Sequence, residues 1–120
     1  MTIEITDDFM RGALQHSRPL TIVLLKKGPA FDRASPVIWE HGRRNFSLRA
    51  EGSLAIVCPI SDDSEYAGVG IFDCDIDETA AIMAGDPGIQ AGMFTYEVHA
   101  SRSFPGDALP GEQLVPRIPN

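Results

Sequence analysis

Long apolar runs and basic clusters are both missing from this chain of 120 residues. No uninterrupted apolar stretch approaches the roughly 20 residues that a membrane-spanning helix needs, and Ile22–Leu25 is typical. Lys26-Lys27 and Arg43-Arg44 are isolated basic pairs, and the formal net charge is −7. The short apolar runs make a membrane protein unexpected. A nucleic-acid-binding surface needs a positively charged patch, so a nucleic-acid binder is not expected either.

The chain also lacks the features of a signal peptide and of a disulfide framework. Its first residues, MTIEITDD, are acidic and have no basic segment followed by an apolar one, so a cytoplasmic location is expected. Cys58 and Cys74 fall on two predicted strands, with Cys58 opposite Ala67 and Cys74 about 23 Å further along. A disulfide needs Cα atoms within about 7 Å, so two reduced thiols are expected. No His or Cys lies at ligand spacing beside them, and we expect neither a metal nor a cofactor.

What is present fits one domain with one core, since 43% of the residues are hydrophobic. Residues 1–18 are predicted to form a helical extension in front of the core. Residues 19–104 are predicted to form the folded domain. Residues 105–120 are rich in Pro and Gly and are predicted to be an extended tail, with apolar residues that suit it to lie on another surface, at Leu109, Leu114, Val115 and Ile118.

Capping residues mark the ends of the first two predicted helices. Thr6 is a good N-cap, and Pro19 ends the helix that follows it and opens a strand to Lys27. Ser35 is followed by Pro36 at the first helical position, which predicts a helix that runs to Glu51 and stops at Gly52. The residues expected on the buried side of this second helix are Val37, Ile38, Trp39, Phe46 and Leu48.

A polar stripe interrupts that apolar side. His41, Asn45 and Arg49 are spaced i, i+4 and i+8, so they lie above one another where burial should be deepest. Buried polar groups need partners, and the stripe therefore indicates a wet cavity, an interface or a hydrogen-bonded network. Gly42 costs the helix about 1 kcal/mol relative to alanine, which suggests a close neighbour at this position.

Two further strands and a polar turn follow. Ser53–Pro59 and Tyr66–Cys74 are predicted strands on either side of the turn Ile60–Glu65. Gly68 and Gly70 share one face of the second of these strands, and two glycines there remove side-chain volume. A hollow is expected on that face.

The last helix and strand surround one acid. Asp75 opens a helix with a capping box, and Gly85 is expected to close it in the left-handed conformation. Asp86 precedes Pro87 and is therefore pushed to an extended conformation. The final strand, Met93–Ser103, alternates between an apolar and a polar face.

The order of the core elements, β-α-β-β-α-β, predicts an α+β fold of the ferredoxin-like type. The expected sheet has four antiparallel strands, with both helices on one face. The other face needs a cover, and a second copy of the chain is a natural one. We therefore expect a homodimer, with a wet-faced monomer as the alternative.

Several short motifs between Pro19 and Ser103 carry a family resemblance. They are His41, Arg44, Leu48 and Gly52, then Ala55–Pro59, then Asp86-Pro87 and Gly92–Val98. With this spacing the chain resembles the YCII-related (YciI-like) family, whose members belong to the dimeric α+β barrel superfamily. The resemblance covers most of the chain, but neither the first helix nor the tail.

The resemblance implies a His–Asp active site, and the matching positions here are His41 and Asp86. Relatives of this kind include a dehydrochlorinase acting on a chlorinated hydroxyquinol. The resemblance therefore implies a small enzyme of the lyase, isomerase or dehydrochlorinase type, with hydroxylated aromatics or lactones as the substrate class. The chain departs from the family at Asn45 and Arg49, where members are often more apolar, and this departure suggests a different ligand.

The residue types also support proton transfer. A histidine takes or gives a proton near neutral pH, and a carboxylate on its other ring nitrogen fixes the tautomer. The sequence contains no nucleophile elbow, dinucleotide-binding glycine motif or P-loop. Candidate substrate-binding residues are Arg44, Asn45 and Arg49, which suit an anionic group or a hydrogen bond, and Tyr96, which suits a ring.

Plainer interpretations of the same residues stay open. His41 is also typical of a hydrogen-bonded core histidine, and Asp86 of a turn or capping acid. Tyr96 and Phe94 are more typical of core residues than of a platform for a ring, and Glu97 with His99 is more typical of a surface or interface pair than of a metal site. At the level of the whole chain, the alternative to an enzyme is a non-catalytic dimeric module that binds a small ligand or a partner protein.

Overall fold

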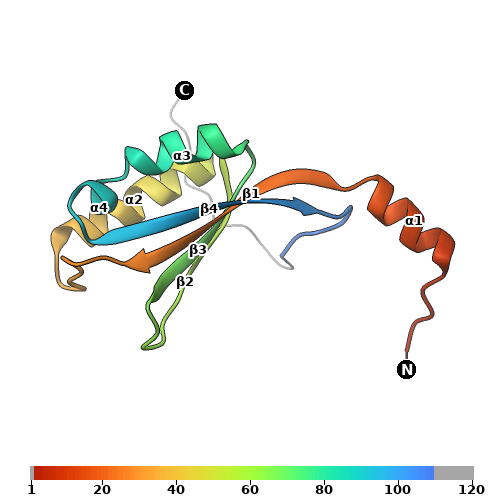
Figure 1. Cartoon of the computed structure of the whole chain (residues 1–120), viewed down its shortest axis with the longest axis horizontal. Helices are drawn as coiled ribbons and strands as arrows, with labels where there is room; N and C mark the ends of the chain where they lie inside the picture. Colours follow the sequence, from red (N-terminus) through yellow and green to blue (C-terminus); the bar gives the residue numbers. More distant parts are fainter. Residues whose placement is uncertain (1, 110–120) are drawn as a thin grey trace.

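The computed structural model describes residues 2–109, which form an α+β structure with one four-stranded antiparallel sheet (Figure 1). The elements follow the predicted order, with one additional short helix before the last strand. They are α1 (Asp7–Gln15), β1 (Arg18–Lys27), α2 (Pro36–Glu51), β2 (Leu54–Pro59), β3 (Tyr66–Phe72), α3 (Ile76–Ala84), α4 (Pro87–Gln90) and β4 (Phe94–Ser103).

The strands lie in the order β2-β3-β1-β4, and every neighbouring pair is antiparallel. This order and the succession of elements are compatible with a ferredoxin-like fold. Helices α2, α3 and α4 all lie over one face of the sheet (Figure 1). Any functional cleft between helix and sheet therefore lies on that face.

The predicted caps form as the sequence indicates. The side chain of Ser35 accepts a hydrogen bond from the Val37 amide, and Gly52 ends α2 with φ of 91°. The Asp75 side chain accepts from the Glu78 amide at the start of α3, and Thr6 does the same for α1. Local capping chemistry thus sets where the helices begin.

Gly85 differs from the prediction, because it is not left-handed. Its φ is −85°, and its amide donates to the Ile82 carbonyl. The chain passes directly into α4, so no left-handed reversal is needed. A Cβ on Gly85 would lie 3.0 Å from Nη2 of Arg44, which gives a different reason for glycine here.

The predicted buried side of α2 is too broad. Trp39 is 72% exposed and Phe46 is 49% exposed, whereas Leu48 is buried. Leu48 and, in part, Ile38 reach the core from α2, while Phe46 lies at the cleft between the helix and the sheet. The fully buried apolar residues of the core are Val23, Leu25, Leu48, Leu54, Phe72, Met83 and Phe94.

The cysteines lie close to the predicted places but in a different register. Cys58 is opposite Val69 rather than Ala67, since the last pair of the ladder before the connecting turn is Pro59 with Gly68. Cys74 lies beyond the end of β3, and its Sγ is 3.1 Å from Oγ1 of Thr79. Both thiols are free.

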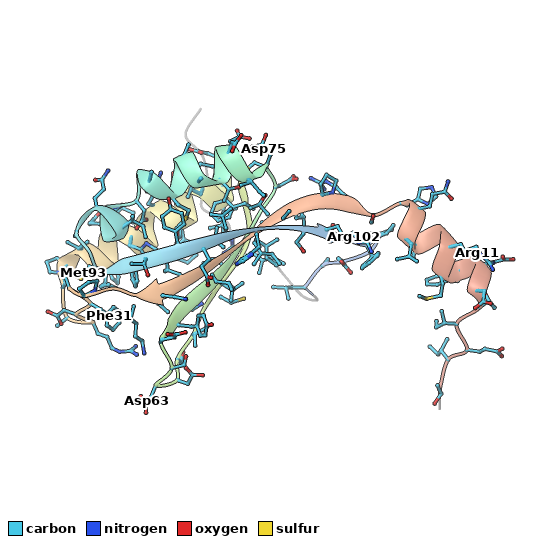
Figure 2. The ribbon with its side chains drawn as sticks, viewed as in Figure 1. Arg11, Phe31, Asp63, Asp75, Met93 and Arg102 are labelled. Carbon is cyan, nitrogen blue, oxygen red and sulfur yellow. The ribbon has the colours of Figure 1, made fainter. Side chains whose placement is uncertain are left out.

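Helix α1 stands away from the rest of the molecule, at the end of an arm (Figure 1). Strands β1 and β4 pair as far as Arg18 and Ser103, beyond the reach of β3, and this two-stranded ribbon carries the helix. None of the α1 residues is buried. Figure 2 shows Arg11 on this helix and Arg102 on the ribbon that leads to it.

The chain ends are only partly described. Leu109 is 69% exposed, while the other apolar tail residues singled out in the sequence, Leu114, Val115 and Ile118, lie outside the described residues. Within residues 2–109, no helix is long and apolar enough to cross a membrane.

Candidate functional site

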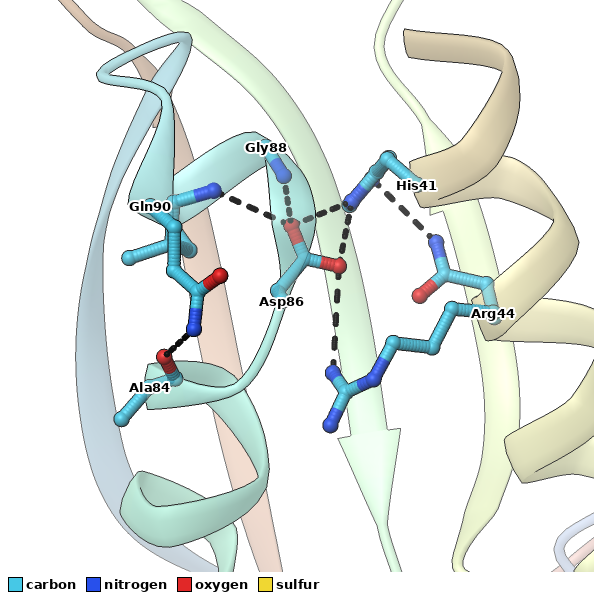
Figure 3. Close-up of polar contacts among 8 residues, drawn as sticks. His41, Arg44, Ala84, Asp86, Gly88 and Gln90 are labelled. Atoms are coloured by element: carbon cyan, nitrogen blue, oxygen red, sulfur yellow. Dashed lines mark hydrogen bonds and ion pairs between the residues drawn. The ribbon is translucent and has the colours of Figure 1, made fainter. Parts of the chain in front are cut away.

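Asp86 is a buried carboxylate at the junction of α3 and α4. It is only 1% exposed, and its backbone is extended, with φ of −72° and ψ of 130°, as expected before Pro87. Its Oδ2 accepts from the amides of Gly88 at 2.9 Å and Ile89 at 3.1 Å (Figure 3). These two bonds make Asp86 the N-cap of α4 and fix the direction of the carboxylate.

His41 reaches this carboxylate from α2. Its Nδ1 lies 2.9 Å from both oxygens of Asp86, although the two residues are 45 positions apart in the sequence. The His41 side chain is 13% exposed and that of Asp86 is 2% exposed, so the pair is sheltered from water (Figure 3). The structure thus brings together the two residues that the sequence singled out as a dyad.

Asn45 contacts the other nitrogen of the same ring. Its Nδ2 lies 3.3 Å from Nε2 of His41, one helical turn away on α2. An amide nitrogen donates hydrogen bonds, so Nε2 is the acceptor and carries the lone pair. The proton of the neutral ring then lies on Nδ1, where it is donated to Asp86. This tautomer is the one that a general base needs, because the lone pair faces outward from the dyad.

Arg44 approaches the carboxylate from the third side. Its Nη1 is 3.8 Å from Oδ1 of Asp86, and its side chain is 28% exposed (Figure 3). A buried carboxylate needs compensation for its charge, and Arg44 supplies part of it. Arg44 therefore supports the acid of the dyad and does not line the neighbouring cleft.

The ring of Phe94 packs against the dyad from β4. Its centroid lies 4.6 Å from that of His41. Gly88 permits this approach, since a Cβ on Gly88 would lie 2.6 Å from Cδ2 of Phe94 and 2.9 Å from Oδ2 of Asp86. The α4 turn therefore fits between an aromatic ring and a carboxylate without room for a side chain.

An open cleft of about 510 Å³ lies between α2 and the sheet, beside His41 and Asn45. Its floor includes Gly68 and Gly70, which confirms the expected hollow on that face of β3. Apolar and aromatic groups form most of its wall, including those of Phe31, Val57, Phe72 and Phe94. This size and lining are typical of a small-molecule site.

Gly42 also lines the cleft, but not for the reason that the sequence suggested. A Cβ on Gly42 would have no atom within 4 Å, apart from the backbone of its own helix. No neighbour among residues 2–109 packs closely against it, so the expected close approach is not found in the described part of the chain. The glycine instead leaves empty space beside His41.

Three cations line the cleft, and the sequence had singled out only Arg49. The guanidinium of Arg49 lies over the ring of Phe46, 5.7 Å from its centroid. That of Arg33 lies over Phe31 at 5.4 Å. Lys27 is the third, and nothing in its sequence surroundings, at the end of a strand, distinguishes it from a surface lysine.

Lys27 is largely occupied by the turn between β2 and β3. Its Nζ donates to the carbonyl of Ser64 at 2.6 Å and to that of Asp62 at 3.4 Å. Hydrogen bonds from Ser64 hold the pKa of Asp62 below its ordinary value of 3.8. The tip of this turn, marked by Asp63 in Figure 2, extends away from the helices.

Tyr96 lies apart from the site. It pairs with Leu25 in the β1–β4 ladder, packs against the core and does not line the cleft. Tyr96 is on β4, at the opposite edge of the sheet from β2, and β2 lines the cleft. Nε2 of His99 and Oε1 of Glu97 are 4.0 Å apart on β4, and the two side chains are 54% and 42% exposed. Among residues 2–109, no group of three or more potential metal ligands occurs.

Sequence reasoning missed the contributions of Phe94 and Gly88. The only available signal was the short spacing between Asp86, Gly88 and Phe94, which keeps them near one another.

Models of known protein families and curated protein sequences give no match to this chain.

Proposed function

We propose that this chain is a small enzyme that moves a proton on a small molecule bound in the cleft. His41 acts as the base or acid, and Asp86 positions its ring. The observation that carries the proposal is the 2.9 Å contact of Nδ1 with a carboxylate that is itself 1% exposed. The acid also caps α4, and the same two amide bonds hold it in the position from which it orients the His41 ring.

The chemical step uses Nε2, the ring nitrogen that does not face Asp86. An acidic C–H or O–H bond of the substrate breaks, its electron pair stays on the substrate, and the proton passes to Nε2 of His41. The Asp86 carboxylate stabilises the imidazolium that forms. The distance from Nδ2 of Asn45 to Nε2 of His41 is 3.3 Å, longer than the usual 2.9–3.0 Å of such a hydrogen bond. A substrate group can therefore replace the Asn45 amide at Nε2.

Hydroxylated aromatics and lactones are the substrate class that we propose first. The cleft has aromatic walls from Phe31 and Phe94 and opens beside His41. No residue of the described site requires a metal or an organic cofactor for proton transfer of this kind. The reaction would be that of a lyase, an isomerase or a dehydrochlorinase, in which loss of a proton starts the rearrangement.

The test is the substitution His41→Gln, assayed against a panel of hydroxylated aromatics and lactones. Turnover and deuterium incorporation from D₂O are measured together with ligand affinity. Loss of a general base lowers the rate by roughly 10²- to 10⁴-fold, while affinity should change by less than about threefold. Glu40→Gln, on the exposed side of the same helix, is the matched control and should leave both quantities unchanged.

Two results would count against the enzyme. Undiminished proton exchange in the His41 variant would remove His41 from the chemistry. Binding of panel members without exchange by the wild-type protein, and with the same affinity after His41→Gln, would favour a non-catalytic ligand-binding module.

We also propose that two copies of the chain pair through the sheet face that carries no described helix. Its centre is apolar, with Ile22 opposite Ile71 and Leu24 opposite Val69, and Leu20 continues the row. All five side chains are only half-buried in one chain. A twofold pairing of this face is the commonest way to cover such a surface.

Charged groups at the rim of this face suit a defined pairing. Glu97 raises the pKa of Lys26 above its ordinary value of 10.5, and their charged atoms are 3.4 Å apart. Such a rim orients an apolar interface rather than driving it. The ferredoxin-like topology, the dimeric α+β barrel and membership of the YCII-related family are part of this same proposal, and they rest on the sequence motifs.

A further inference from the structure

The cleft has a charge opposite to that of the whole protein. The chain carries a formal net charge of −7, yet Lys27, Arg33 and Arg49 line the cleft, and none of the Asp and Glu residues between positions 2 and 109 does. An acidic protein with a positive, largely apolar cleft attracts small anions to that place and repels them elsewhere. The sign of the charge therefore restricts the ligands that the cleft selects.

Arg49 is the cation best placed to hold an anionic group. Its side chain is half-buried, and among residues 2–109 no carboxylate forms an ion pair with it. By contrast, Arg44 pairs with Asp86 and Arg43 pairs with Glu40. The planar guanidinium of Arg49 lies over Phe46, which orients its donors without using them.

Gly42 adds a second, independent observation. It lies in the interior of α2, where glycine costs stability, and no atom beyond the backbone of its own helix would contact a Cβ there. The residue therefore keeps a part of the cleft empty between His41 and the end of the polar stripe. Glycine lowers the stability of α2 at this position, and no side chain of residues 2–109 fills the space, so the space is available to a ligand.

We infer that the cleft binds an organic carboxylate whose apolar body fills the space beside Gly42 and whose anionic end pairs with Arg49. This inference rests on the proposed function only for the reacting end of the ligand, which lies at Nε2 of His41. Eight residues separate His41 from Arg49, a rise of about 12 Å along the helix. With the reach of the arginine side chain, a ligand of one ring and a short acidic arm spans the two.

The test compares an acid with its uncharged amide. The probes are 3-phenylpropionate and 3-phenylpropanamide, titrated into the full chain by calorimetry, with backbone amide shifts of Gly42 and Asn45 locating the site. A charge-assisted pair gives the acid an affinity about tenfold higher than that of the amide. Arg49→Gln should abolish this preference and leave the affinity for the amide unchanged.

Two variants make the comparison specific. Arg43→Gln removes an exposed arginine of the same helix that does not line the cleft, and it should keep the full preference. Arg49→Lys retains the charge without the planar fork and should keep part of it. Circular dichroism of each variant establishes that α2 is intact.

The inference is overturned if the wild-type protein binds acid and amide equally, if neither binds at millimolar concentration, or if Arg49→Gln keeps the preference. The proposed proton transfer fails separately, because it depends on His41. An acid preference that survives together with proton exchange in His41→Gln would leave the ligand class standing and remove the dyad. If proton exchange requires His41 but the protein shows no preference for the acid, the dyad stands and the proposed ligand class fails.

Discussion

The Asp86 carboxylate is surrounded by donors on several sides. Two backbone amides of α4, the ring of His41 and the guanidinium of Arg44 surround a group that is 1% exposed. Such a group is costly to bury and is stable only while its donors stay in place. The same contacts that stabilise the carboxylate also fix the His41 ring, so stability and chemistry are linked at this residue.

Removing this carboxylate is therefore expected to destabilise the fold. Asp86→Ala leaves the amides of Gly88 and Ile89 without their acceptor and should lower the free energy of unfolding by about 1–3 kcal/mol. Asp86→Asn keeps an oxygen for those amides and should cost less. Urea denaturation measures both. Equal stability of the alanine variant and the wild-type protein would show that the cap contributes nothing.

At the residue scale, the sequence could predict that His41 and Asp86 are distinctive residues, but not that they contact each other. Asp86 before Pro87 is a local signal, and the His41 stripe is a helical one, so each is visible within a few residues. Their contact is set by the packing of α2 against α4, which depends on the whole core. The roles of Phe94 and Arg33 were missed for the same reason. Strand alternation places Phe94 on the apolar face but does not show that its ring contacts His41, and Arg33 belongs to no local pattern.

At the scale of helices, two glycines in similar settings have opposite roles. Gly88 lies in α4, where a side chain would overlap Phe94 and Asp86, whereas Gly42 lies in α2 beside empty space. The sequence marks Gly42 as a residue that weakens its helix, but it does not show what surrounds either glycine. Only the surroundings of the missing Cβ separate a glycine required by packing from one that leaves room.

Alanine substitutions at these positions should change stability in opposite directions. Gly42→Ala should raise the free energy of unfolding by about 0.5–1 kcal/mol, because alanine is the better helix former. Gly88→Ala should lower it by about 1–3 kcal/mol through overpacking. Thermal and urea unfolding of the pair measure the effect, and changes of the same sign would contradict the packing described for α4.

The helix starts were the most predictable elements, and Gly85 shows where such reasoning ends. Ser35, Asp75 and Thr6 all cap as expected, because capping involves only three or four neighbouring residues. Gly85 was expected to be left-handed, but its φ is −85°. A following helix that starts at once, and a neighbouring Arg44, are tertiary facts that its local sequence does not contain.

At the scale of the whole molecule, one chain leaves two apolar surfaces uncovered. No helix of residues 2–109 lies over the sheet face around Ile22, and the apolar side chains of α1, including the 62% exposed Phe9, are not buried. The Cα radius of gyration is 16.7 Å, against about 14 Å for a compact chain of this length. In a paired assembly, the second copy would cover apolar surface that a single extended chain leaves exposed.

A charge at the centre of the open face should separate the two copies. In light scattering, the wild-type protein is expected to show about twice the mass of one chain, and Ile22→Lys the mass of a single chain, because a buried lysine there would have no partner. Ala81→Lys, at an exposed position of α3 on the opposite side, is the control and should stay paired. A wild-type protein of single mass would contradict the proposed pairing.

The overall architecture was predictable because strand alternation and helix periodicity are global patterns in the sequence. The α+β class and the four antiparallel strands are confirmed. The cleft and its three cations were not predicted as a unit, since Lys27, Arg33 and Arg49 come from a strand, a loop and a helix. Their common position appears only when the sheet and α2 are assembled.

The central claim is that Asp86 holds His41 as a base with its lone pair on Nε2, and NMR of the ¹⁵N-labelled imidazole tests it without any substrate. At a pH where the ring is neutral, the wild-type protein is expected to show the proton of His41 on Nδ1 and none on Nε2. Free histidine prefers the other tautomer, so this result would report the Asp86 contact directly. A His41 ring with its proton on Nε2 would contradict the account.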